Sequence, residues 1–327
     1  MTHALFVTEH GDRSVLQVRE LDVPEPGSGE IQVRVAAVGV NFIDVYKRRG
    51  IYPGSTPFVS GDEGAGTVEA VGDGVKGFRR GDRVAWGQCG GSAAELVNLP
   101  ASSAVAVPDE LNLTLAAAAM LQGMTAHYLT ESLFPVREGD IALVHAAAGG
   151  VGQLLVQMIT HKGADVIATA GSSEKLMIAS RLGATHVIDY RQYDCCPDEL
   201  AAAVRGAAGR GVDVAYDGVG KATFEASLRS LRPRGTMALF GGASGQVPPF
   251  DLQRLNQLGS LFVTRPSLGA YLATREELKW RAGAVLASLA DGSLQIDISG
   301  TYGLDDAAAA YEALEGRATS GKLLLIP

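Results

Sequence analysis

The sequence predicts an α/β protein of two domains, a doubly wound parallel sheet joined to a β-rich domain. The chain has 327 residues, which is long for one ordinary core and comfortable for two. From Asp140 onward, strand-like and helix-like segments alternate, whereas the first hundred residues show only short alternating runs separated by Gly and Pro. These observations together define the fold class.

Composition narrows the possible functions. The chain is 46% hydrophobic and 20% charged, with a net charge of -8, which argues against partners bound through phosphates or anionic lipids. No apolar run approaches the roughly 20 residues of a membrane span, and the start lacks the pattern of a signal peptide. Three cysteines cannot form a disulfide framework. We therefore expect a cytoplasmic protein in a reducing compartment.

The N-terminal hundred residues predict an antiparallel sheet or partial barrel. Short alternating runs such as "EIQVRVAAVGV" and "GAGTVEAVGDGV" are separated by turn-rich stretches such as "PEPGSGE". A segment rich in Ala, Leu and Met follows, "PDELNLTLAAAAMLQGMTAHYLTESLF", and this composition favours a helix.

The middle of the chain predicts the parallel sheet. "IALVHAA", "DVIATAG", "THVIDY", "VDVAYDGVG" and "TMALFGG" are strand-like, and a helix-like segment follows each of the first four. We place this domain at 123–264 and the β-rich domain at 1–122 with 265–327. The tail adds two expected helices and a strand, "KLLLIP", which we expect to fold back onto the N-terminal part.

The stretch "HAAAGGVG" predicts a dinucleotide site. Such loops need small residues for the turn, for the approach of the pyrophosphate and for helix packing, and here Ala147, Gly149 and Gly152 take those places. Gly150 and Val151 offer backbone N–H groups at a helix N-terminus. A tightly packed turn with no ligand is the alternative. The position at the start of a βαβ series favours the dinucleotide.

The second strand of this series indicates NADP(H). An NAD site usually has an acidic residue at the end of that strand, but here Ala170 and Gly171 are followed by Ser172. Hydroxyls, helix N–H groups and Lys175 would receive a 2′-phosphate. The alternative for Lys175 is an ordinary solvated lysine.

The N-terminal part lacks the residues of a zinc site. Catalytic zinc needs three protein ligands, yet the first hundred residues contain only His3, His10 and Cys89 as His or Cys. In "VSGDEGAGTVEAVG", Asp62 occupies the place of a ligating His, and Asn41 lies where a Cys would be expected. We therefore predict no metal. Without a Lewis acid, reducing an activated acceptor is easier than oxidising an alcohol.

Four segments together resemble one family. "AAVGVNFIDVYKRRGIYP", "LVHAAAGGVGQLLVQ", "DVAYDGVG" and "GSLFVTRPSL" are similar to the NADPH:quinone oxidoreductases, the zeta-crystallin-like, zinc-free branch of the medium-chain dehydrogenases/reductases. The resemblance covers nearly the whole chain. It implies a homodimer, a GroES-like domain split around a Rossmann domain, and NADPH bound in the cleft between them.

The resemblance also implies which residues border the cofactor. The residues nearest the nicotinamide would be Asn41, Phe42, Ile43, Asp44 and Tyr46, with Tyr128 under the cleft, and Val263, Thr264 and Arg265 closing over the amide. The phosphates would meet Gly149, Gly150, Val151, Gly171, Ser172, Lys175 and Tyr190. Further contacts would come from Gly218, Phe240, Gly241, Gly242, Ala243 and, from the tail, Arg317. Gly218 stands where relatives often carry Ser, and "FGGASG" has an extra Gly.

The hypothesis for catalysis is direct hydride transfer from NADPH to a stacked quinone. Tyr46 and Tyr52 would flank the acceptor, and Asn41 could donate a hydrogen bond to the developing oxygen. Structural alternatives exist for each group: Tyr52 could only pack its loop, Asn41 could fix the turn, and Asp44 could cap the next helix. No residue is an obvious general acid.

Two rival functions share these features. One is an NADPH-dependent 2-alkenal or enoyl reductase, and the other is a non-catalytic nucleotide-binding protein. We expect a homodimer formed through the edge strand near "GSLFVTRP".

Overall fold

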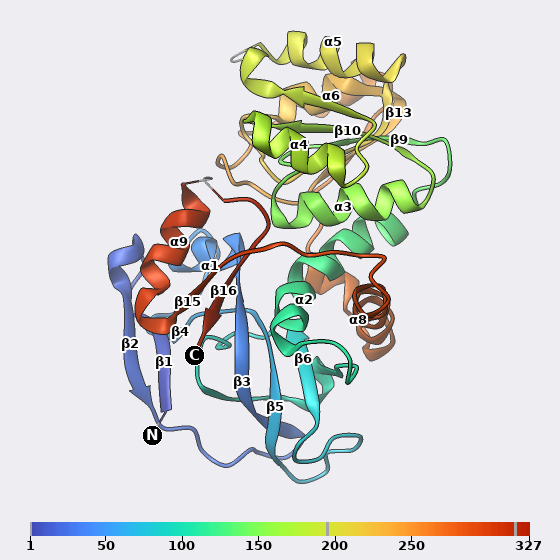
Figure 1. Ribbon diagram of the computed structural model, residues 1–327. Coiled ribbons are helices and arrows are strands. Elements are labelled where there is room, and N and C mark those ends of the chain that lie inside the picture. Colours follow the sequence, from blue (N-terminus) through green and yellow to red (C-terminus); the bar gives the residue numbers. More distant parts are fainter. Residues whose placement is uncertain (1, 194–195, 317–318) are drawn as a thin grey trace. The chain divides into compact units, whose positions relative to one another are not determined.

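The computed structural model describes residues 2–193, 196–316 and 319–327 (Figure 1). The chain divides into two compact units. The first comprises Met1–Met124 with Tyr271–Pro327, and the second comprises Thr125–Ala270.

The first unit is β-rich and contains two sheets. The smaller has the order β2-β1-β4, and the larger has the order β15-β16-β3-β5-β6-β8, with β7 also paired to β3. The strands are β1 (Thr2–Val7), β2 (Leu16–Leu21), β3 (Glu30–Val40), β4 (Phe58–Val59), β5 (Glu63–Val71), β6 (Arg83–Gly87), β7 (Leu96–Pro100), β8 (Ala104–Ala106), β15 (Ile298–Gly303) and β16 (Lys322–Ile326). The helices are η1 (Arg13–Val15), α1 (Phe42–Arg48), η2 (Ala101–Ser103), α2 (Leu113–Tyr128), η5 (Leu268–Tyr271), α8 (Arg275–Ala290), η6 (Leu304–Asp306) and α9 (Ala307–Glu315). Two of these, α2 and η5, cross the boundary between the units.

The pairing of β3 explains why this unit is built from both ends of the chain. Its alternating residues Ile31, Val33 and Val35 are buried in the core of the unit, as a half-buried strand requires. The last strand pairs antiparallel to it, with Leu324 opposite Gly39. The return of "KLLLIP" to the N-terminal sheet is therefore confirmed. The parallel neighbour β15 was not expected, because "ISGTYG" carries two glycines and little apolar character.

The second unit is a six-stranded sheet in which every pair is parallel. The strand order is β11-β10-β9-β12-β13-β14. Its strands are β9 (Ile141–Val144), β10 (Asp165–Ala170), β11 (His186–Asp189), β12 (Val212–Asp217), β13 (Leu231–Leu239) and β14 (Phe262–Thr264). Its helices are η3 (Leu129–Leu133), α3 (Gly150–His161), α4 (Ser173–Arg181), η4 (Tyr190–Tyr193), α5 (Pro197–Ala208), α6 (Phe224–Ser230) and α7 (Gln253–Gln257). Every residue of β12 is buried, as expected of a strand covered on both faces. The doubly wound sheet is confirmed.

One boundary in this unit was predicted wrongly. The helix-like segment that the sequence predicts after "VDVAYDGVG" is "ATFEASLRSLRPRG", but α6 ends at Ser230 and β13 begins at Leu231. Pro233 explains the early end, because proline disfavours the helical conformation of the residue before it and lacks the backbone N–H that a helix uses.

No helix among the described residues is long and apolar enough to cross a membrane.

Candidate active site

The strand order of the second unit defines where a nucleotide would bind. Counted along the chain, the six strands lie in the order 3-2-1-4-5-6, so the winding reverses between β9 and β12. In open α/β sheets, ligands bind outside the carboxyl ends of the strands at such a reversal. The loops after β9, β10, β12 and β13 share this edge, and we call them the cofactor loops, residues 145–149, 171–172, 218–223 and 240–243 with the helix starts that follow.

The loop after β9 is shaped by close backbone packing. Ala146 has a left-handed φ of 50°, which is uncommon for a residue other than Gly. A Cβ at Gly152 would lie 2.3 Å from the Ala146 carbonyl oxygen and 2.8 Å from Ala147 Cα. Gly149 is the N-cap of α3, where a side chain would lie 3.2 Å from the same oxygen. The structure thus gives a physical reason for small residues at these positions, and the start of α3 presents N–H groups suited to an anion.

The side chain of His145, at the start of this loop, is buried. Its Nδ1 lies 2.8 Å from Thr169 Oγ1, and burial lowers the pKa of the imidazole. This histidine therefore links β9 to β10 within the sheet rather than reaching outward.

The loop after β10 fits a phosphate better than a ribose diol alone. Ser172 is the N-cap of α4 and accepts a hydrogen bond of 3.3 Å from the Lys175 backbone N–H. Burial lowers the pKa of the Lys175 ammonium, so an anion there would offset a desolvation cost. A Cβ at Gly171 would lie 2.6 Å from the Tyr190 hydroxyl, so Tyr190 and this loop meet. Tyr190 begins η4, directly after β11, and does not lie within the third strand as expected.

The loops after β12 and β13 approach each other through glycines. A Cβ at Gly218 would lie 2.8 Å from the Phe240 ring, and one at Gly241 would lie 2.4 Å from the Gly218 carbonyl oxygen. Gly218 therefore makes room for the Phe240 ring.

Asp217 is a residue of this region that the sequence reasoning missed. Its buried carboxylate accepts from the backbone N–H groups of Val219 and Gly220 at 2.8 and 2.9 Å, and from two hydroxyls, those of Thr223 and Ser227, at 2.7 and 2.9 Å. This carboxylate fixes the loop after β12. The dipeptide Asp-Gly in "YDGVG" is a turn signal that could have indicated it.

The remaining expected cofactor residues of the second unit lie on several elements. Tyr128 is buried at the end of α2, Val263 and Thr264 lie on β14, and Arg265 donates to the Pro266 carbonyl oxygen at 3.4 Å. Gly242 and Ala243 follow β13, and Gly150 and Val151 form the first turn of α3. Arg317 lies outside the described residues.

In the first unit, α1 begins with a cap built from the expected site residues. Asn41 is the N-cap, and its backbone N–H donates to the Asp44 carboxylate at 2.8 Å. The Asn41 amide nitrogen also donates to the Gly39 carbonyl oxygen at 3.1 Å. Both structural roles considered for these residues, fixing the turn and capping the helix, are therefore present.

The aromatic residues of α1 and its following loop gather together. The Tyr46 and Tyr52 ring centroids lie 5.5 Å apart in an edge-to-face arrangement, and Phe42 and Tyr46 lie 6.2 Å apart. Phe42 and Tyr46 are four positions apart on the helix, so they share a face. Tyr52 joins them because its backbone N–H donates to the Tyr46 carbonyl oxygen at 3.3 Å.

A buried ion pair lies beneath Asn41. The Lys322 ammonium donates to Glu63 and, at 2.8 Å, to Asn41 Oδ1, and the Lys322 and Glu63 side chains are both 0% exposed. Glu63 also accepts from the Asn41 amide at 2.7 Å and from the Leu121 backbone N–H at 2.5 Å. We call Asn41, Glu63 and Lys322 the buried triad.

This pairing changes the expected role of Asn41. Its amide nitrogen donates to both Gly39 and Glu63, so its two N–H bonds are already used. Its oxygen accepts from Lys322 and from Gln122 at 3.2 Å. Donation from this amide to an acceptor's oxygen, as hypothesised from the sequence, does not fit these hydrogen bonds.

Three carboxylates crowd the same region. Burial, reinforced by the neighbouring charge of Asp62, raises the pKa of Asp44 well above its usual value. Asp62 forms an ion pair with Lys47. The described residues hold no group of three or more His, Cys, Asp or Glu side chains that could bind a metal ion. An ammonium group, from Lys322, already lies against Glu63 and Asn41, and a divalent cation beside it would be repelled.

Neither Glu63 nor Lys322 was singled out from the sequence. They are 259 positions apart, and no local pattern joins them. The one available signal was a lysine at the start of the apolar strand "KLLLI".

The fold and these loops define a dinucleotide-dependent oxidoreductase of the medium-chain dehydrogenase/reductase class. A family model described as "Alcohol dehydrogenase GroES-like domain" matches residues 27–109, and one described as "Zinc-binding dehydrogenase" matches residues 150–282. A quinone oxidoreductase of Salmonella typhimurium is 44% identical over 98% of both chains. The structure of Escherichia coli quinone oxidoreductase complexed with NADPH is 40% identical, covers 99% of this chain and 100% of that one, and has a TM-score of 0.95. A 2-haloacrylate reductase of Burkholderia is 39% identical over 100% of this chain and 99% of its own.

The chain belongs to the quinone oxidoreductase family. The resemblance inferred from the four sequence segments is confirmed.

Proposed function

We propose that this protein is an enzyme that reduces quinones with NADPH. The proposal rests on the presence of two features in the same chain. Neither residue between β10 and α4, Gly171 or Ser172, is acidic, and Asn41, which lies where a metal-binding Cys would be expected, is hydrogen-bonded within the buried triad. Full-length identity to quinone oxidoreductases supports it.

The cofactor loops fit NADPH by their shape. Gly149, Gly150 and Val151 would receive the pyrophosphate, and Gly171, Ser172, Lys175 and Tyr190 would receive the 2′-phosphate. When bound, NADPH supplies the hydride that converts a quinone to its hydroquinone. Further contacts are proposed for Tyr128, Gly218, Phe240, Gly241, Gly242, Ala243, Val263, Thr264, Arg265 and, on the side of the first unit, Asn41, Phe42, Ile43, Asp44 and Tyr46.

The acceptor would lie against Tyr46 and Tyr52, whose rings offer an apolar face and hydroxyl tips. Asn41 would act by holding the start of α1 against β3 and Glu63, which sets where Tyr46 lies. Because the hydroquinone anion that hydride transfer leaves can take its proton from solvent, no side chain is assigned as an essential general acid.

A second candidate is reduction of an activated alkene, because the 2-haloacrylate reductase of Burkholderia covers the full chain at 39% identity. The test compares turnover of 1,4-benzoquinone, 2-chloroacrylate and an unsaturated ketone, each with NADPH under anaerobic conditions. Faster turnover of the quinone by at least tenfold supports the proposal. Preference for either alkene would replace it with the second candidate.

We also propose a cytoplasmic homodimer that forms through β14. This strand ends the six-stranded sheet, and Phe262 on it is 62% exposed. An unpaired edge with an exposed aromatic residue favours pairing with a second copy. Sedimentation of the wild type as a dimer, and of Phe262→Lys as a monomer, would support this. Exposed Leu252, on the segment before α7, provides the control Leu252→Lys, which should leave the dimer intact. A monomeric wild type would contradict it.

A further inference from the structure

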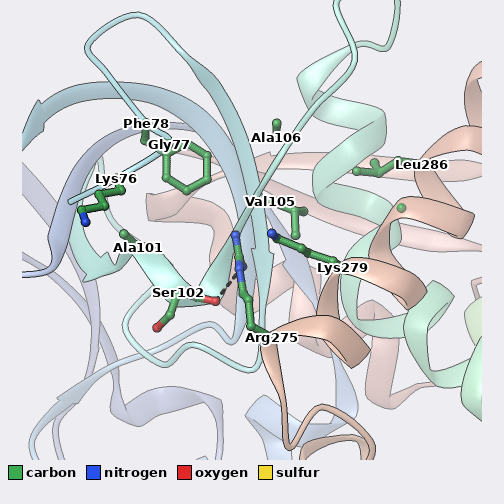
Figure 2. A pocket seen from close by; sticks show the side chains of 11 residues that line it. Lys76, Gly77, Phe78, Ala101, Ser102, Val105, Ala106, Arg275, Lys279 and Leu286 are labelled. Atoms are coloured by element: carbon green, nitrogen blue, oxygen red, sulfur yellow. Dashed lines mark hydrogen bonds between the residues drawn. The ribbon is translucent and has the colours of Figure 1, made fainter.

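A cavity of about 580 Å³ lies within the first unit, and none of its lining residues is proposed above to contact cofactor or acceptor. One wall comes from the segment between β5 and β6, with Lys76 and Phe78, and another from α8, with Arg275 and Lys279. Figure 2 shows Lys76 and Phe78 on one side of this space and Lys279 on the other. A cavity of this size is in the range that holds small organic ligands.

The charges around this cavity are of one sign. Its lining contains three basic side chains, those of Lys76, Arg275 and Lys279, and no acidic one. Among the described residues, no carboxylate lies within ion-pair distance of any of the three. The protein as a whole has a net charge of -8, so an unpaired basic cluster runs against its overall charge. The cluster is therefore suited to an anion.

Arg275 is held in place for such a role. Its Nη1 donates to the Ser102 carbonyl oxygen at 2.6 Å, as Figure 2 shows, and this bond fixes the guanidinium at the cavity. Burial lowers the pKa of this guanidinium. A partly buried cation without a carboxylate gains from an anionic ligand, because the ligand restores the interactions that water would have provided.

The rest of the lining is apolar. The Phe78 ring, Val105 and Leu286 contribute carbon surface beside the three cations. On α8, Arg275, Lys279, Gly283 and Leu286 follow helical spacing, so they line the cavity from one face of the helix. A Cβ at Gly283 would meet no atom within 4 Å, so the cavity stays open at this position.

We propose that this cavity binds a small aromatic carboxylate, with its ring against Phe78 and its carboxylate between Arg275 and Lys279. The aromatic ring would pack against the apolar walls, and the planar guanidinium would donate hydrogen bonds to the carboxylate. The inference does not depend on the quinone reductase proposal, because no lining residue belongs to the proposed catalytic site.

The test is isothermal titration calorimetry of the full-length protein with 2-naphthoate, in the presence of saturating NADPH so that the cofactor loops are filled. We expect a Kd of about 0.1 mM, typical of a ligand of this size. The uncharged 2-naphthamide should bind at least tenfold more weakly. Inorganic phosphate at millimolar concentration should not displace 2-naphthoate, since it lacks the ring.

Two variants act on different properties of the cavity. Lys279→Gln removes a charge and should weaken binding about fivefold to tenfold. Gly283→Leu fills the open space without changing charge and should weaken binding more than tenfold. The control Arg80→Gln removes an equal charge from the same segment between β5 and β6, at a residue outside the lining, and should change binding less than twofold. NADPH oxidation by all three should equal that of the wild type, which shows that they fold.

Three results would overturn the proposal. These are no detectable binding at 5 mM 2-naphthoate (about fifty times the expected Kd), equal binding of the amide, or unchanged affinity in both Lys279→Gln and Gly283→Leu. Failure here would leave the quinone assay unaffected, so the two proposals can fail separately.

Discussion

The two units hold their candidate functional residues by different physical means. In the second unit, the cofactor loops depend on backbone atoms that approach so closely that side chains are excluded, as at Gly152 and Gly241. In the first unit, the region around Asn41 depends on charged side chains that are buried and paired, above all Lys322 with Glu63. A cofactor site built from backbone atoms therefore tolerates almost no added atoms, whereas a region built from buried ions tolerates almost no lost charge.

The largest expected effect is on the buried triad. Lys322→Met leaves Glu63 buried without its partner, and breaking such a pair costs about 3–5 kcal/mol. Urea unfolding should show this loss in the free energy of unfolding. The double variant Glu63→Gln/Lys322→Met should recover a large part of it, since no charge is then stranded. If Lys322→Met lowered the free energy of unfolding by less than 1 kcal/mol (well under the cost of an uncompensated buried charge), the buried ion pair would not be what holds this region together.

The matching change in the second unit is Gly152→Ala. The added methyl group would overlap the Ala146 carbonyl oxygen, so the loop must shift. We expect NADPH affinity to fall by about tenfold to a hundredfold, the equivalent of the 1–3 kcal/mol cost of overpacking.

Gly206→Ala is the control for that experiment. Gly206 lies in α5 of the same unit, and a Cβ there would meet nothing within 4 Å. This variant should bind NADPH normally and gain slightly in stability because alanine favours the helix. Equal NADPH affinity in both variants would show that close packing at Gly152 does not shape the loop.

A smaller effect is expected on cofactor choice. Lys175→Gln should weaken NADPH binding by about tenfold through loss of a charge-assisted contact to the 2′-phosphate, while NADH binding should stay within twofold. Fluorescence titration with each cofactor measures the ratio. An equal loss of affinity for NADPH and NADH would show that Lys175 does not bind the 2′-phosphate.

The raised pKa of Asp44 should make the stability of the protein depend on pH. The folded protein holds the Asp44 pKa above its unfolded value, so the protonated carboxyl contributes stability that is present below about pH 4 and is lost as pH rises through the folded pKa. Asp44→Asn cannot ionise and still offers an oxygen to the Asn41 N–H. Its stability relative to wild type should therefore increase from pH 4 upward in thermal unfolding. A constant difference across that range would mean that Asp44 titrates normally.

The smallest expected effect concerns the aromatic pair. Tyr46→Phe keeps the ring beside Tyr52 and removes only the hydroxyl, so we expect kcat/KM with 1,4-benzoquinone to fall by about threefold. A complete loss in Tyr46→Phe, with NADPH affinity intact, would make the hydroxyl essential.

The same contrast explains what the sequence could predict. The parallel sheet and the loop after β9 could be inferred because small residues and strand–helix alternation are local patterns. The end of α6 and the strand β15 could not, since each depends on tertiary pairing that competes with local preference. Lys322 and Glu63 escaped notice because their contact joins distant positions. The sequence also could not show that the side-chain amide of Asn41 makes four hydrogen bonds, because its partners come from four separate positions along the chain.

The central claim is tested most directly by anaerobic oxidation of NADPH in the presence of 1,4-benzoquinone, with the hydroquinone quantified. We expect one hydroquinone formed for each NADPH consumed, and a higher kcat/KM with NADPH than with NADH. Tight binding of NADPH without its oxidation by any member of a quinone panel would contradict the claim, and would instead indicate a nucleotide-binding protein without catalytic activity.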